Sequence, residues 1–195
     1  MDTTRVAGTT GLLGALGGAL FMAQAVMQLT GEVGHVTDSL VSAVAFYCVT
    51  AILVGLLRTG AAGTSRVGHV GLFLWIIGTA SIALGATVQL VSNLSEDDNL
   101  FYAIGGLGQL IGGLIAGIAI ARAGVMPGWL RWAPLGWALY YLAILPVMVV
   151  TPEGSAVSPP LEIGLGAIIA ATSWGFAHSA PARAASESPG VSVGR

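Results

Sequence analysis

The chain has 195 residues, of which 55% are hydrophobic and only 8% are charged, whereas roughly 25% of the residues of an ordinary soluble domain are charged. So few charges cannot cover the surface of a soluble fold of this size, and the composition therefore predicts a protein of the lipid bilayer. The formal net charge of -2 provides no basic surface for a row of phosphates, which argues against nucleic acid as a partner.

Six apolar stretches are long enough for helices that cross a membrane, which takes roughly 20 residues for about 30 Å of hydrocarbon. In chain order they cover residues 11–29, 40–57, 67–91, 101–121, 132–150 and 161–177. The predicted fold is all-α, an integral membrane bundle of six transmembrane helices within residues 1–179. Residues 180–195 are rich in Ala, Ser, Pro and Gly without apolar periodicity, and we expect them to form a disordered tail.

The start of the chain leaves one alternative. The residues Ala23-Gln24-Ala25 follow an apolar stretch and resemble a signal-peptidase site, and cleavage there would leave five spans. The apolar run continues through Leu29, however, and only Arg5 precedes it. We therefore favour a first transmembrane helix.

The basic residues alternate with the predicted spans. All seven are arginines, and they fall before the first span, between the second and third, between the fourth and fifth, and after the sixth: Arg5, Arg58, Arg66, Arg122, Arg131, Arg183 and Arg195. The loops on the other side contain no arginine, and their acidic residues are Glu32, Asp38, Glu96, Asp97, Asp98 and Glu153. The positive-inside rule then predicts a multi-pass protein of the cytoplasmic membrane with both termini in the cytoplasm.

Four tryptophans lie near the cytoplasmic end of the predicted bundle. Trp129 and Trp132 adjoin the start of the fifth span, and Trp137 and Trp174 lie within two turns of the same face. Tryptophan is favoured at membrane interfaces, where its ring is buried and its N–H stays in contact with water. We interpret these side chains as membrane anchors in preference to ligand contacts.

Small residues recur at helical spacing in the first and fourth spans. The pairs are Gly14 with Gly18, Gly108 with Gly112, and Gly113 with Gly117. Such ridges let two helices approach closely, and we expect them to pack helices within one bundle, with a homo-oligomer interface as the alternative. Because the first and fourth spans run in opposite directions, their similarity also leaves open an inverted repeat of spans one to three and four to six, as in many transporters.

Polar side chains of the predicted spans are concentrated toward their outer ends. Gln24 and Gln28 share one face of the first span, and Gln89 and Asn93 repeat that spacing on the third. The complete candidate ligand-binding face is Gln24, Gln28, Glu32, His35, Gln89, Asn93, Tyr102, Gln109 and Glu162. If these faces converge, they form an outward-facing polar pocket. Otherwise the amides hydrogen-bond to neighbouring helices or to lipid headgroups.

Several kinds of chemistry are disfavoured. No Asp, Glu or Arg lies in the middle of a predicted span, which argues against proton pumps, coupled antiporters and voltage sensors. The absence of lysine excludes a Schiff base to retinal or pyridoxal phosphate. Glu32, His35 and Asp38 lack a second cluster that would complete a metal site. No catalytic sequence motif occurs, so we expect no cofactor and no metal, and we assign no catalytic residue.

One short segment carries a family resemblance. Met126-Pro127-Gly128-Trp129-Leu130-Arg131-Trp132, after a span that ends in Arg122, resembles a loop of uncharacterised small six-span membrane proteins of high-GC Gram-positive, actinobacterial type, a domain of unknown function. In that group a Leu/Met-Pro-x-Trp-Leu-x-Trp loop joins spans four and five, and the length and layout are similar. The resemblance implies a fold and a type of source, and it transfers no catalytic residue.

The sequence favours a non-catalytic protein, surrounded by membrane lipid, that binds or moves a small amphipathic or lipid-like molecule through the outer polar face. Two other classes stay open. One is an intramembrane enzyme that modifies a lipid or isoprenoid with Glu32, His35 or Glu162 as proton donor. The other is a packing subunit of a membrane complex that dimerises through its glycine ridges.

Overall fold

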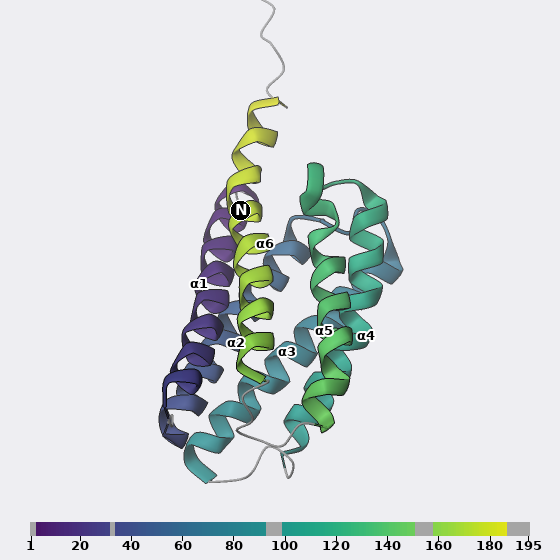
Figure 1. Cartoon of the computed structure of the whole chain (residues 1–195). Coiled ribbons are helices and arrows are strands. Elements are labelled where there is room, and N and C mark those ends of the chain that lie inside the picture. Colours follow the sequence, from purple (N-terminus) through teal and green to yellow (C-terminus); the bar gives the residue numbers. More distant parts are fainter. Residues whose placement is uncertain (1–2, 32–33, 93–98, 151–157, 187–195) are drawn as a thin grey trace, which may run out of the picture.

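The computed structural model describes residues 3–31, 34–92, 99–150 and 158–186 (Figure 1). Within these ranges the regular structure is entirely helical, which confirms the predicted all-α class. The helices are α1 (Thr3–Thr30), α2 (His35–Arg58), α3 (Arg66–Ser92), α4 (Leu100–Ala123), the short 3-10 helix η1 (Gly128–Arg131), α5 (Ala133–Val150) and α6 (Ser158–Ser186).

Five of these helices are long and apolar enough to cross a membrane. They are α1, α2, α3, α4 and the part of α6 from Ser158 to Ser179. In α5 the corresponding apolar stretch, Ala133–Val147, is shorter. The structure therefore supports a multi-pass helical bundle with several membrane-spanning helices, and by length and composition it supports five such helices where the sequence predicted six.

Two helices extend beyond the predicted spans. α1 begins at Thr3, eight residues before the expected start at residue 11, and α6 continues to Ser186, past residue 177 and into the expected tail. A span is recognised in a sequence by its apolar residues, whereas a helix can continue into a polar environment because its backbone hydrogen bonds are internal. The final residues, 187–195, lie outside the described part.

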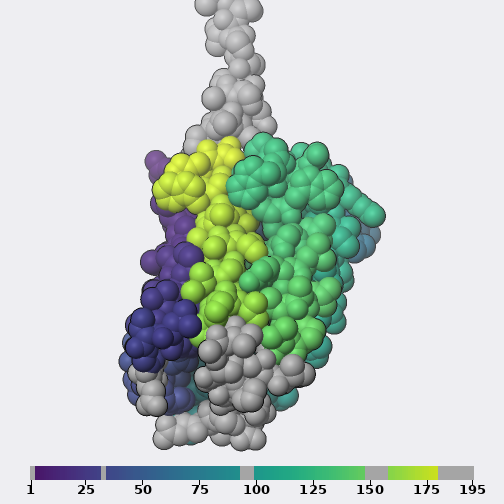
Figure 2. Space-filling view, in the orientation of Figure 1, coloured from purple at the N-terminus to yellow at the C-terminus, as the bar shows by residue number. Residues whose placement is uncertain are grey.

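The six α-helices form a closed ring in chain order. Each helix packs against the next, and α6 packs back against α1. Figure 2 shows α6 between α1 and α5 on one face of the molecule. The contacts of α1 with α6 and of α3 with α4 are the most extensive, and the contact of α5 with α6 is the least extensive of the ring.

Both extensive contacts are lined by glycine. A Cβ atom added to Gly18 would lie 2.5 Å from the backbone oxygen of Gly166 on α6, and one added to Gly112 would lie 2.8 Å from the backbone oxygen of Gly71 on α3. The backbones thus meet directly, as small residues permit. Each of the six glycines singled out in the sequence lies against a neighbouring helix of the same chain: Gly14, Gly18, Gly108, Gly112, Gly113 and Gly117.

The similarity of these helix pairs does not extend to three-helix units. If Gly18 corresponds to Gly112, then Gly17 corresponds to Ile111; yet Gly17 packs against α2, whereas Ile111 is 49% exposed. Conversely, Gly117 packs against Leu135 of α5, while Ala23, at the corresponding position of α1, is exposed. The neighbouring helices α2 and α5 therefore flank the two pairs on opposite faces. An inverted repeat would place them on the same face, so the fold repeats a helix pair and not a three-helix unit.

Apolar side chains fill the middle of the ring. They include Val49, Ile52, Leu53, Leu56, Leu72, Ile120, Ile169 and Phe176, all buried. The rings of Trp75 and Trp137 lie there too, with centroids 4.6 Å apart. The interpretation of Trp137 as a membrane anchor is therefore wrong, whereas Trp129, Trp132 and Trp174 are more than half exposed. A binding surface has to be sought at the ends or the outside of the bundle.

Candidate functional site

The two ends of the bundle differ in charge. The described arginines lie where α1 and α3 begin and α2 and α4 end, with Arg131 on η1. We call this the arginine end, which is uppermost in Figure 1. The described acidic residues, Asp38 and Glu162, lie near the starts of α2 and α6, at the end that we call the acidic end. Each end contains one candidate site.

At the acidic end, polar side chains of α1 and α2 form a first cluster. The Gln24 amide donates to the Asp38 carboxylate and to the Ser42 hydroxyl, both at 2.8 Å, and the Gln28 amide donates to the same Asp38 oxygen at 3.1 Å. Because α2 begins at His35, Asp38 lies in its first turn, where the helix dipole stabilises a negative charge. The sequence had suggested a loop here.

A second cluster ties α2, α3 and α4 together. His35 Nε2 lies 3.2 Å from the backbone oxygen of Gln89, and the Tyr102 hydroxyl donates to Gln89 Oε1 at 2.8 Å. Asn99 caps the start of α4 and donates through its amide to the backbone oxygen of Gly85 at 3.0 Å. The two clusters meet at the first turn of α2, which carries both His35 and Asp38.

The polar residues predicted from the sequence are therefore partly brought together, but through hydrogen bonds between helices. This geometry corresponds to the second of the two expectations, in which the amides bond to neighbouring helices. One acceptor is an exception, because Gln24 Oε1 is buried and has no hydrogen-bond partner among the described residues.

Two more residues of the predicted set, Gln109 and Glu162, belong to the described part of the chain. Gln109 is buried about two turns further along α4 than Tyr102, and Glu162 lies near the start of α6. Glu32 and Asn93 lie outside the described residues. Among the described side chains, no three of His, Cys, Asp and Glu are grouped so that they could hold a metal ion.

Sequence reasoning missed two members of the clusters. Ser42 and Asn99 were not candidates, although an asparagine directly before an apolar stretch is a common helix N-cap and could have identified Asn99. Ser42 gave no such signal, because its contact with Gln24 depends on how α1 and α2 are rotated against each other.

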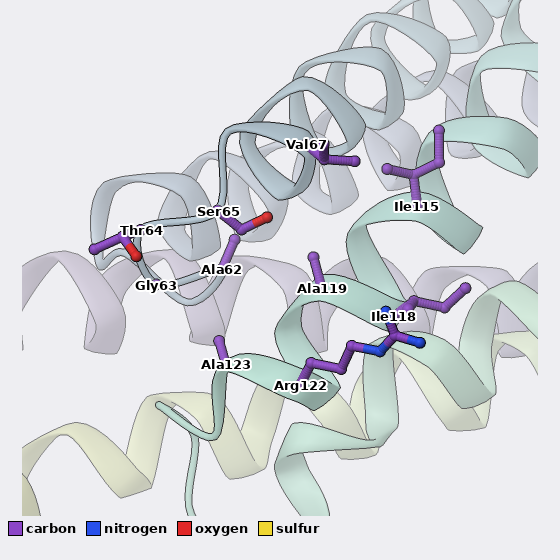
Figure 3. A pocket seen from close by; sticks show the side chains of 10 residues that line it. All are labelled: Ala62, Gly63, Thr64, Ser65, Val67, Ile115, Ile118, Ala119, Arg122 and Ala123. Carbon is purple, nitrogen blue, oxygen red and sulfur yellow. The ribbon is translucent and has the colours of Figure 1, made fainter.

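At the arginine end, a groove of about 790 Å³ lies between the start of α3, the end of α4 and the connection that precedes α3 (Figure 3). Its walls are largely apolar, and Val67 and Ile115 point toward one another across it. Ile118 and Ala119 continue the wall on α4, and Arg122 adds a guanidinium that extends toward Ile118 in Figure 3. The groove is thus amphipathic, with aliphatic walls and one guanidinium.

Local sequence signals position the polar end of this groove. α4 ends at Ala123, and the next residue, Gly124, adopts φ 62° as a left-handed C-cap, so that Arg122 lies in the last turn of the helix. Ser65 caps α3, since its hydroxyl oxygen accepts from the backbone N–H of Gly68 at 3.1 Å. In the sequence Arg122 indicates only topology, because a linear pattern does not show that the end of α4 meets the start of α3.

No model of a known protein family, no curated protein and no solved structure matches this chain. The proposed function therefore rests on the geometry of the two ends.

Proposed function

We propose that this chain is a six-span protein of the cytoplasmic membrane that binds an amphipathic, lipid-like molecule in the groove between α3 and α4. The observation that carries this proposal is the groove itself. Its volume of about 790 Å³ falls within the roughly 300–1,000 Å³ of typical ligand sites. Its combination of aliphatic walls and Arg122 matches a molecule with an apolar chain and a polar head.

Six spans are favoured because α5 takes part in the ring. It packs between α4 and α6 and runs alongside them in Figure 1. Its 18 residues amount to about 27 Å at 1.5 Å per residue, close to the hydrocarbon thickness of about 30 Å. With α5 as a span, the arginine ends of all the helices face one side, which the positive-inside rule assigns to the cytoplasm.

The groove is a better candidate than the acidic end. There the amides of Gln24, Gln28 and the side chain of Gln89 already take part in bonds between helices. Arg122, in contrast, is exposed and has no hydrogen-bond or ion-pair partner among the described residues. A charged group without a protein partner is available to a ligand.

The other two classes have less support. His35, one proposed proton donor, is in contact with the backbone oxygen of Gln89, and Glu32 lies outside the described residues. The glycine ridges proposed for dimerisation pack within the chain, where Gly18 meets α6 and Gly112 meets α3.

Native mass spectrometry of the protein released from lipid nanodiscs tests this proposal. Ile118 lines the groove, and Leu139 on α5 lies away from the groove with similar exposure. We expect one retained amphipathic molecule per wild-type chain and per Leu139→Trp chain, and an at least fivefold lower occupancy in Ile118→Trp, whose larger side chain fills the groove. Equal retention by both variants, or no retained molecule in the wild type, would contradict the proposal.

A further inference from the structure

We infer that the occupant of the groove between α3 and α4 is an anionic phospholipid of the leaflet at the arginine end, and that Arg122 binds its phosphate. This inference rests on the proposed function, because it assumes that the bundle is embedded in a bilayer and that the groove is a binding site. It adds the charge and the chemical class of the ligand.

The apolar part of the site extends beyond the groove along α4. Ile104, Leu107, Ile111 and Ile118 are all exposed, and their spacing places them on one side of the helix. This stripe runs from the second turn of α4 to the groove, where Ile115 joins it. A lipid with its headgroup near Arg122 would lay an acyl chain along this stripe, toward the middle of the bilayer.

The polar part of the site carries positive charge, and none of the described acidic residues lies beside it. Arg122 lies in the last turn of α4, and Arg66 opens α3 beside the groove-lining Val67. Within the described residues the only acidic side chains, Asp38 and Glu162, lie at the opposite end of the bundle. A phosphate diester supplies the missing negative charge, and the planar guanidinium of arginine can bind two of its oxygens at once.

The start of α3 adds to this preference. The first backbone N–H groups of a helix carry a partial positive charge that favours anions, and the first turn of α3 borders the groove through Ser65 and Val67. Thr64, on the same wall, is exposed and can offer its hydroxyl to a headgroup. The arginines and the start of α3 therefore favour a negative ligand over a neutral one.

The same charges discriminate between phospholipids. A zwitterionic lipid also carries a phosphate, but its ammonium group would have to lie close to the guanidinium groups of Arg122 and Arg66. An anionic lipid such as phosphatidylglycerol brings no such cation. The site should therefore select by net charge and not only by the presence of a phosphate.

The test uses the full chain in nanodiscs that contain equal amounts of phosphatidylglycerol and phosphatidylcholine with identical acyl chains. Native mass spectrometry then gives the identity of the retained lipid. We expect the wild type to retain one lipid, with phosphatidylglycerol enriched at least fivefold. Arg122→Gln should lower this enrichment to about twofold or less, whereas Arg122→Lys, which keeps the charge, should preserve most of it.

Arg131→Gln is the matched control, because Arg131 also lies at the arginine end but on η1, with its guanidinium over the ring of Trp132 at 5.3 Å from the ring centroid. It should leave the enrichment unchanged. Equal retention of the two lipids, abolished by Ile118→Trp, would overturn the inference and leave the proposed function intact. A bare wild-type monomer would overturn both, and a bare dimer would mean that a second copy covers the groove, which also contradicts the inference.

Discussion

At the scale of single residues, the polar clusters show what one sequence can indicate and what it cannot. The residue types and spacings pointed to the acidic end of α1, α3 and α4, and Gln24, Gln28, Gln89 and Tyr102 do lie there. Their partners depend on the rotation of each helix about its axis, which the sequence leaves undetermined when apolar residues surround the whole helix. The sequence around Asp38 suggests a loop. In the structure, the Asp38 carboxylate accepts hydrogen bonds from two glutamines of α1.

The bond between Tyr102 and Gln89 should contribute measurably to stability. We expect a double-mutant cycle of Tyr102→Phe and Gln89→Leu to give a coupling energy of about 0.6 kcal/mol and at most about 1.7 kcal/mol, the range found for hydrogen bonds between membrane helices. The backbone oxygen of Gln89, which faces His35, is unchanged in both variants. Reversible unfolding in mixed micelles measures the coupling, and a value of zero would show that the 2.8 Å contact does not hold the helices together.

At the scale of helices, the glycine ridges were recognisable in the sequence but their partners were not. Closely spaced small residues indicate that some helix approaches closely, and they fit any neighbour equally well. The structure assigns the ridge of α1 to α6, which is last in the chain, and the ridge of α4 to α3. The first of these contacts closes the ring and is invisible to reasoning that follows neighbours along the chain.

A bulky residue in this ridge should break a helix pair. A leucine side chain at Gly112 would begin at a Cβ atom in contact with the backbone of Trp75 and 2.8 Å from Gly71 O. We expect Gly112→Leu to lower the free energy of unfolding by about 1–3 kcal/mol, the usual cost of overpacking.

The control for this prediction is Gly136→Leu on α5, where an added Cβ meets nothing within 4 Å. It should change the free energy of unfolding by less than about 0.5 kcal/mol, as expected for an exposed position. Both variants can be measured by reversible unfolding in the same micelles. Similar losses in the two variants would mean that the contact between α3 and α4 is not the close one described here.

At the scale of the whole molecule, the alternation of arginines along the chain is enough to predict how the two ends of the bundle differ in charge. The ring, its apolar interior and the groove could not be predicted, because they arise from contacts between helices distant in the chain. Trp137 illustrates the limit, since its place near a span end suggested the interface, whereas its ring is buried against Trp75. The number of spans depends on α5, whose short apolar stretch is ambiguous by length.

Cysteine labelling in intact cells can establish the number and direction of the spans. In a Cys48→Ala background, Gly34→Cys at the acidic end should react with a membrane-impermeant thiol reagent, whereas Thr64→Cys at the arginine end should not. Gly34, Thr64 and a third labelling position, His178 on α6, are all exposed.

The decisive position is His178, near the arginine end of α6. With six spans, His178→Cys is protected like Thr64→Cys, because both lie on the cytoplasmic side. With α5 outside the membrane, α6 would cross in the opposite direction and His178→Cys would react like Gly34→Cys.

The measurement that tests the central claim most directly is photo-crosslinking from within the groove. A benzophenone amino acid replaces Ile118 or, as the control, Leu139, which is exposed on α5 away from the groove. Both proteins are irradiated in bilayers of equal phosphatidylglycerol and phosphatidylcholine, and the adducts are identified by mass. We predict that Ile118 gives mainly phosphatidylglycerol adducts, while Leu139 gives the two lipids in the proportions of the bilayer. The same mixture of adducts at both positions would show that the groove is ordinary lipid-facing surface and that Arg122 selects nothing.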